Sequence, residues 1–242
     1  MVNELLKHQN AESDGSRYAT DFDYIMHQFC VEKFSRFIVG CDVVELGCYR
    51  GHMTNILSKR AKSVIAVDID EECLRRTQAN LDTTENVTLV KAEFDDLRLE
   101  KEVDTVYFSH ALEHVENPQQ TLERLRAGVS ASRFIMIVPN GESLSRRIAQ
   151  KLGLVQHRLA VTEFERNIGH NTTFNRGALE YVVTNAGFQI VESGGICPKI
   201  FSNGQIDRAL KEGIINLNFL HALNQLSEEL PDICASIYVI AE

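Results

Sequence analysis

The fold is decided by residues 43–51, which read VVELGCYRG. The apolar residues at the start predict a short buried strand. The glycines at 47 and 51 let the backbone turn tightly and approach a ligand without a side chain in the way. The next apolar run, 63–67, is followed by Asp68. A carboxylate at the end of that strand can accept hydrogen bonds from both hydroxyls of a ribose, so these features fit a site for NAD or for S-adenosylmethionine.

Short β-rich runs alternate with longer helical runs along the chain. The expected strands are 42–46, 63–67, 87–91, 103–108, 133–138, 188–192 and 235–241. The expected helices are 52–59, 71–81, 118–128 and 176–186, preceded by a leading helix within 18–39. This alternation predicts βαβ units and an α/β fold, with a doubly wound, mainly parallel sheet that helices cover on both faces.

The composition is that of a soluble globular protein with an acidic balance. Of its 242 residues 44% are hydrophobic, and the formal net charge is −9. This balance argues against a nucleic-acid-binding protein, which usually carries a basic surface. No apolar run reaches the roughly 18–20 residues of a membrane-spanning helix, and residues 1–14 lack the apolar core of a secretion signal. The six cysteines form no C-x-x-C pair, so we expect reduced thiols and a cytoplasmic location.

The pattern predicts an N-terminal helical segment, 1–39, and one domain, 40–242. Two insertions, at about 140–175 and 204–229, stand outside the alternation. They are expected to form a helical cap over the carboxyl edge of the sheet, where ligands bind in open α/β folds. The stretch 209–226 is expected to be a lid or a helix that contacts a second copy of the chain in a homodimer.

The sequence resembles the class I S-adenosylmethionine-dependent methyltransferases over about residues 40–190. The resemblance rests on six motifs in collinear order. They are Glu45-Leu46-Gly47-Cys48-x-x-Gly51, Asp68-Ile69, Ala92-Glu93-Phe94, 104–115 with Asn117-Pro118, Ile137-Val138-Pro139-Asn140 and Asn185-Ala186-Gly187-Phe188. Tyr49 departs from the family pattern, because it replaces the middle glycine of the usual run. The chain has no Tyr-x-x-x-Lys pair, which argues against an NAD enzyme.

The resemblance implies a seven-stranded sheet, S-adenosylmethionine as cofactor, and transfer of its methyl group to a nucleophile by in-line displacement. It also implies which residues bind the cofactor. They are Glu45, Gly47, Cys48, Tyr49, Gly51, Asp68, Ile69, Glu93, Phe94 and Ser109.

A cluster of His and Glu residues follows the expected fourth strand. His110, Glu113 and His114 have the i, i+3, i+4 spacing that places side chains on one face of a helical turn, and His170 lies in a later loop. Three interpretations stay open. His114, His170 or His110 acts as a general base on an acceptor hydroxyl; all four residues bind a divalent metal ion; or they only cap the helix and hold the loop.

The metal interpretation has a parallel in methyltransferases that act on quinone precursors and on 2′-hydroxyls of small RNAs. In those proteins an acidic residue stands where this chain has His110.

The first insertion carries a local positive charge. Residues 143–162 contain Arg146, Arg147, Lys151 and Arg158 and no acidic residue, and apolar residues recur between them at helical spacing. The plain interpretation is a cap helix with a solvated rim. The functional ones are a phosphate-bearing acceptor, bound by Arg147 and Lys151, or peripheral contact with an anionic membrane surface.

The end of the chain, at 194–199 and 231–235, resembles methyltransferases of bacterial polysaccharide and sugar biosynthesis. The resemblance therefore implies a small-molecule acceptor, namely a hydroxyl of a sugar or of a nucleotide-linked or lipid-linked sugar. An amine acceptor and the metal-assisted reaction on quinone precursors or RNA are alternatives. A catalytically silent, cofactor-binding regulatory subunit is an alternative of another class.

Overall fold

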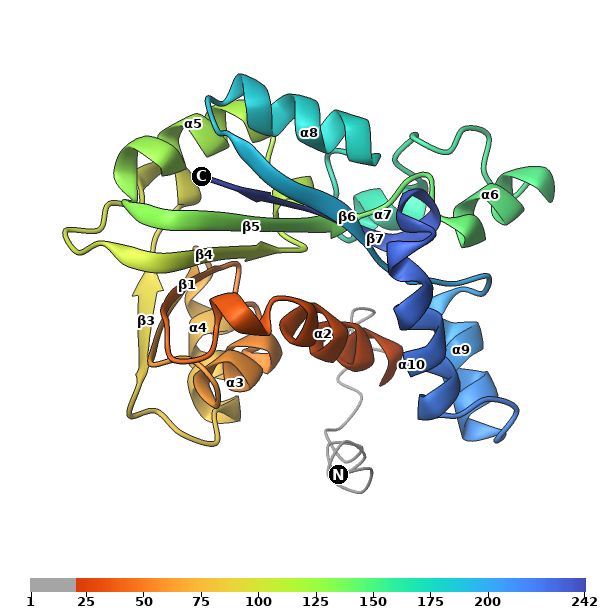
Figure 1. The fold of residues 1–242 in the computed structure, drawn as a ribbon, viewed down its shortest axis with the longest axis horizontal. Helices are drawn as coiled ribbons and strands as arrows, with labels where there is room; N and C mark the ends of the chain where they lie inside the picture. The colour runs from red at the N-terminus through yellow and green to blue at the C-terminus, as the bar shows by residue number, and fades with distance from the viewer. Residues whose placement is uncertain (1–20) are drawn as a thin grey trace.

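The computed structural model describes residues 21–242, and its centre is a seven-stranded sheet (Figure 1). The strands are β1 (Asp42–Leu46), β2 (Ser63–Asp68), β3 (Val87–Lys91), β4 (Val103–Ser109), β5 (Ala131–Pro139), β6 (Ile190–Pro198) and β7 (Cys234–Ala241). Their order is β3-β2-β1-β4-β5-β7-β6, with β1 to β5 parallel and β7 antiparallel to both of its neighbours. The predicted doubly wound, mainly parallel α/β fold is confirmed.

Helices cover both faces of the sheet (Figure 1). The described helices are α2 (Asp21–Lys33), α3 (His52–Ser58), α4 (Glu71–Asn80), α5 (Pro118–Gly128), α6 (Leu144–Lys151), α7 (Glu163–Asn167), α8 (Arg176–Asn185), α9 (Asn203–Lys211) and α10 (Leu217–Gln225), of which α6 and α7 lie beyond the end of the sheet. One hydrophobic core lies under α2, α3, α4, α9 and α10, and a second lies under α5 and α8 on the opposite face. Successive strand residues serve the two cores alternately, since Val43 packs in the first and Val44 in the second.

The strand order reverses between β1 and β4, whose carboxyl ends lie side by side. The chain runs from β1 outward through β2 to β3 and then returns to the other side of β1 as β4. In open α/β sheets ligands bind at such a reversal of strand order, because the loops that leave the two central strands diverge there. The loops that leave β1, β2 and β4 therefore lie at one edge of the sheet, and most of the residues that the sequence predicts for the site are in them.

Most predicted bounds are within two residues of the structure, and glycines account for the main features of the three larger differences. The expected strand 188–192 begins at Ile190 and continues to Pro198 through Gly194 and Gly195. A Cβ on Gly194 would lie 2.8 Å from the Tyr238 hydroxyl oxygen, so the glycines let β6 pass close beside β7. The expected helix in 143–162 ends at Lys151, and the run 209–226 is divided between α9 and α10. Gly153 and Gly213 lie just beyond those helix ends with positive φ angles of 73° and 70°.

The leading helix is α2, which buries Phe22 and Phe29 in the first core. Residues 18–20 of the expected helix, and the polar residues 1–14, lie outside the described residues. The division into a segment 1–39 and a domain 40–242 stays a prediction. All six cysteines are free thiols, as the sequence predicts.

Within residues 21–242, no helix is long and apolar enough to cross a membrane.

Candidate active site

The turn after β1 has two positions, Gly47 and Gly51, where the backbone conformation and the close neighbours favour glycine. Gly47 has a φ of 82°, and a Cβ there would lie 2.8 Å from the Cβ of Ala111. Gly51 has a φ of 80°, and a Cβ there would lie 2.8 Å from the Cα of Thr77. The amides of Gly47 and Cys48 both donate to the carbonyl of Val67, at 2.9 and 3.2 Å. The turn is therefore fixed between the ends of β2 and β4.

Asp68 joins this turn to the end of β2. Its Oδ2 accepts a hydrogen bond from the amide of Tyr49 at 2.9 Å, and its Oδ1 accepts one from the amide of Asp70 at 3.0 Å. Each carboxylate oxygen has capacity for a second hydrogen bond. The carboxylate thus fixes the turn and can still accept hydrogen bonds from ribose hydroxyls. Ile69 follows it with a side chain that is 56% exposed.

Tyr49, which replaces the family's middle glycine, keeps a glycine-like backbone. Its φ of 48° lies in the left-handed region, and its exposed ring lies beside the Arg50 guanidinium, whose Cζ is 5.2 Å from the ring centre. A side chain in this region costs roughly 1–2 kcal/mol. The turn therefore keeps the path that a glycine would favour.

Tyr49→Gly is expected to leave the free energy of unfolding unchanged or to raise it by up to about 1 kcal/mol, because glycine adopts this backbone without strain. The measurement is urea unfolding of both proteins. The matched control is Tyr181→Gly in α8, an exposed helical tyrosine, where glycine should lower stability by about 0.5 kcal/mol or more. A larger loss at Tyr49 than at Tyr181 would show that the ring of Tyr49 holds the turn together.

The remaining predicted cofactor residues lie on or just after β1, β3 and β4. Phe94 begins a short 3-10 helix after β3, packs edge-on against Phe108 with ring centres 5.0 Å apart, and lies 3.7 Å from the Cβ position of Gly47. The preceding Glu93 is exposed. Within the described residues, Ser109 Oγ at the end of β4 and Glu45 Oε2 on β1 are buried and have no hydrogen-bond partner. Buried polar atoms without partners and a glycine surface are features that a bound nucleoside would complete, so these residues fit the predicted cofactor.

Glu45 and Cys48 are kept uncharged by burial. Desolvation raises the pKa of the Glu45 carboxyl to about 8 and the pKa of the Cys48 thiol to about 12. The folded protein therefore holds a proton on Glu45 that the unfolded chain releases above its ordinary pKa of 4.5. Protonated Glu45 therefore contributes its full share to the free energy of unfolding below pH 4.5, and this contribution is lost as the pH rises toward about 8.

Glu45→Gln should remove this pH dependence, because the amide cannot ionise. Between about pH 5.5 and 7.5 we expect the unfolding free energy of the wild type to fall, relative to that of the variant, by about 1.4 kcal/mol per pH unit. Urea unfolding at several pH values measures the difference. Parallel curves for the two proteins would mean that the Glu45 pKa is not raised.

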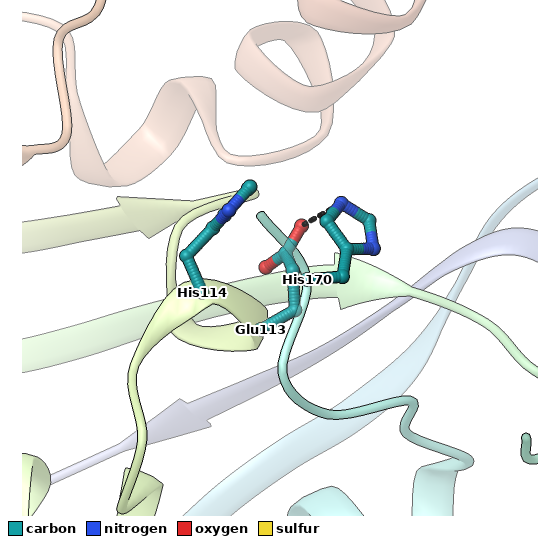
Figure 2. A group of neighbouring side chains, drawn as sticks. All are labelled: Glu113, His114 and His170. Carbon is teal, nitrogen blue, oxygen red and sulfur yellow. Dashed lines mark ion pairs between the residues drawn. The ribbon is translucent and has the colours of Figure 1, made fainter. Parts of the chain in front are cut away.

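A separate group of side chains meets at the carboxyl edge of β4 (Figure 2). Glu113 and His114 lie on the short 3-10 helix Leu112–His114, and His170 lies on the loop between α7 and α8. The Glu113 carboxyl points toward His170, with 4.0 Å between Oε1 and Nε2. The two imidazole rings stand nearly perpendicular, with centres 4.7 Å apart. The structure thus brings together three of the four residues predicted for this cluster.

His110 has a different place from the one that its spacing predicts. It has a φ of 52°, and its amide donates to the carbonyl of Ile137 at 2.8 Å. Its Nε2 lies 3.3 Å from the Ser236 hydroxyl of β7, while its Nδ1 lies 3.7 Å from Glu113 Oε1. The expected helical turn starts only at Leu112, so His110 does not share a helical face with Glu113 and His114.

These groups are uncharged at neutral pH. Desolvation raises the pKa of Glu113 to about 8 and lowers the pKa of His170 to about 4. The pKa of His110 falls to about 3 through desolvation and its histidine neighbours, and desolvation also lowers the pKa of His114. Neutral imidazoles are the form that accepts a proton or binds a metal ion.

The basic insertion is less positive than its own sequence indicates. Arg146 forms an ion pair with Glu165, which lies just beyond the stretch that has no acid. Arg147 and Arg158 both pair with Glu142, just before it, at 3.3 and 2.8 Å. Lys151 is exposed at the end of α6. Three of the four cations therefore pair with two flanking carboxylates, so these carboxylates offset part of the positive charge of the insertion.

Sequence reasoning missed residues that complete this region. The side-chain amide of Asn171 donates to the carbonyl of His114 at 2.6 Å. His27 of α2 lies close enough to His110 to lower its pKa, and its own buried Nδ1 has no partner within the described residues. Glu165 could have been found by counting acids beyond the edges of the basic stretch. Nothing in the local sequence marks His27, because its placement depends on how α2 packs.

Comparison with known proteins agrees with this geometry. The model of the methyltransferase domain family matches residues 8–193. A search of curated proteins finds no match to this chain.

Solved structures share the fold. One is the S-adenosylhomocysteine complex of magnesium protoporphyrin IX methyltransferase from Synechocystis PCC 6803, with 16% identity, a TM-score of 0.59 and coverage of 99% of this chain and 91% of that one. A second is an S-adenosylmethionine-dependent methyltransferase from Mesorhizobium loti, with 20% identity, a TM-score of 0.57 and coverage of 89% and 97%. A third is an N-methyltransferase from Bradyrhizobium japonicum, with 11% identity, a TM-score of 0.56 and coverage of 99% and 94%.

The family match covers most of the chain, and the fold and the glycine turn after β1 agree with it. The chain belongs to the methyltransferase domain family and is an S-adenosylmethionine-dependent methyltransferase of class I.

Proposed function

We propose that this methyltransferase acts on a hydroxyl of a small metabolite, and that the acceptor is a sugar or a nucleotide-linked or lipid-linked sugar. The observation that supports a hydroxyl is the pair of neutral imidazoles, His114 and His170, beside the buried Glu113 at the same sheet edge as the cofactor turn. A hydroxyl has to lose its proton near neutral pH, whereas an amine needs only to be uncharged. A proton acceptor at this place is therefore more useful for a hydroxyl.

The chain's part in the reaction is to position the acceptor and to take its proton. Bound S-adenosylmethionine supplies a methyl group that its sulfonium already activates. The turn at Gly47 and Asp68 would hold this cofactor, and the acceptor would lie between it and the histidines. An imidazole nitrogen of His170 or His114 would take the proton of the acceptor hydroxyl as its oxygen accepts the methyl group, and S-adenosylhomocysteine would leave. Positioning supplies much of the rate, and a base adds roughly 10²–10⁴-fold.

A small polar hollow beside His170 supports a polar acceptor. It has a volume of about 20 Å³, which is room for a water-sized group, and it is lined by polar residues that include Arg146, Glu165 and Thr173. Within the described residues, Arg146 Nε and Thr173 Oγ1 are buried without a partner. A hydroxyl group of the acceptor would satisfy them. Arg147 and Lys151 are proposed to contact its more distant, negatively charged part.

An amine acceptor is the competing proposal, since the fold is shared with an N-methyltransferase. The test is release of S-adenosylhomocysteine from S-adenosylmethionine with nucleotide sugars, free sugars, catechols and primary amines. We expect turnover with a hydroxyl compound and a methyl ether as product. Turnover with amines alone would contradict the proposal. Binding of S-adenosylhomocysteine without turnover on any compound would favour a catalytically silent subunit.

A further inference from the structure

The ligand-type atoms of Glu113, His114 and His170 all lie within 4.8 Å of one another (Figure 2). We propose that these three side chains form a binding site for a divalent transition-metal ion of the zinc type. Two imidazoles and one carboxylate suit such an ion. Three protein ligands are also the number that catalytic zinc sites use, with a further position open to water or substrate.

Glu113 is the residue that most clearly lacks a partner. It is 1% exposed, and its Oε2 has no hydrogen-bond partner within the described residues. Its Oε1 faces His170 Nε2 at 4.0 Å and His110 Nδ1 at 3.7 Å, which are too long for hydrogen bonds. A buried carboxyl group is costly unless it is hydrogen-bonded or bound to a cation. A metal ion in the group would satisfy it.

The backbone around the three side chains holds them in place. The amides of Asn171 and Thr172 donate to the carbonyl of Glu113, at 2.9 and 3.1 Å. Together with the bond from the Asn171 side chain to His114, these bonds tie the loop that carries His170 to the helix that carries the other two residues.

A second contact orients His114. A Cβ on Gly169 would lie 3.2 Å from Nδ1 of His114, so the glycine lets the loop approach the ring, and His114 also hydrogen-bonds to the backbone of Gly169. Histidines that bind metals usually donate their second nitrogen to a carbonyl or carboxylate, which fixes the ring. The arrangement therefore has the outer support that a metal site needs.

The role of the ion in catalysis rests on the proposed function, whereas its binding does not. A divalent ion beside the acceptor lowers the pKa of a hydroxyl and so makes the oxygen nucleophilic near neutral pH. His114 and His170 would then be ligands instead of the base. His110 is not part of the group of three, and its Nε2 forms a hydrogen bond with the Ser236 hydroxyl. We therefore do not assign it to the ion.

The experiment is calorimetric titration of the full-length, tag-free protein, stripped with EDTA, with Zn²⁺ and with Mn²⁺ separately. We expect one ion per chain. Glu113→Gln and His170→Gln should each weaken binding by about tenfold or more, because each removes one of three ligands. The matched control is His157→Gln, an exposed histidine of the cap, which should bind as the wild type does. Binding of S-adenosylhomocysteine shows that each variant is folded.

Two results would overturn the site. One is that the wild type binds neither ion at a concentration of about 100 μM, which is well above the dissociation constant expected of a structured site. The other is equal uptake by the wild type, Glu113→Gln and His170→Gln. Methyl transfer by the stripped enzyme separates the two proposals: activity without metal keeps the hydroxyl methyltransferase and removes the ion from its mechanism. Failure of every hydroxyl acceptor, with metal binding intact, contradicts only the proposed function.

Discussion

Asp68→Ala is expected to weaken the binding of S-adenosylhomocysteine by about 100-fold or more. Hydrogen bonds to a charged group contribute roughly 1.5–3 kcal/mol each, and two bonds to a ribose would be lost together. The change also removes the acceptor for the amides of Tyr49 and Asp70, so the turn loses part of its support. Calorimetric titration of both proteins with S-adenosylhomocysteine measures the effect.

The matched control is Asp70→Asn, two residues away. Asp70 caps α4 by accepting a hydrogen bond from the amide of Glu72 at 2.8 Å, and asparagine caps helices equally well. The affinity of this variant should stay within about threefold of the wild type. An Asp68→Ala protein that is folded and binds with unchanged affinity would show that the ribose is bound elsewhere.

His170→Gln and His114→Gln are expected to lower kcat on a hydroxyl acceptor by roughly 10²–10⁴-fold while leaving the affinity for S-adenosylhomocysteine unchanged. Both variants remove a proton acceptor or a metal ligand, so the loss follows from either mode of action. The control His157→Gln should retain full activity. A loss of less than about threefold in both variants would mean that positioning alone drives the reaction.

The pH profile tests the same site in the unmodified enzyme. Because burial lowers the pKa of His170 to about 4, its imidazole stays unprotonated far below neutral pH. We expect kcat/KM to stay level from about pH 8 down to about pH 5 and to fall only as the pH approaches 4. A fall centred near pH 6.5, the ordinary value for histidine, would contradict the lowered pKa.

Much of the fold could be predicted from the sequence, because local signals and packing agree in the first half of the chain. β1, β3 and α5 have the bounds that their sequence predicts, since apolar runs and turn residues mark both ends. The elements near the end of the chain are harder to predict from the sequence. β6 contains Gly194 and Gly195, which locally indicate a loop, and only the neighbouring Tyr238 of β7 explains why glycines are needed there.

The cluster could be predicted only in part, for a similar reason. The spacing of Glu113 and His114 is visible in the sequence, but their contact with His170 depends on a loop that returns from the cap. The ion pairs of Arg146 and Arg147 were missed because their partners lie just outside the basic stretch. The cofactor and catalytic roles of the individual residues stay predictions.

The most direct test of the central claim is calorimetric titration with S-adenosylhomocysteine, with NADH in parallel. The chain has no tryptophan, so intrinsic fluorescence is a poor probe and heat is the better signal. We predict binding of S-adenosylhomocysteine with a Kd on the order of micromolar, about −8 kcal/mol, and no binding of NADH. Absence of any S-adenosylhomocysteine binding would mean that the turn at Tyr49 has lost the cofactor, and the account of this chain as a working methyltransferase would be contradicted.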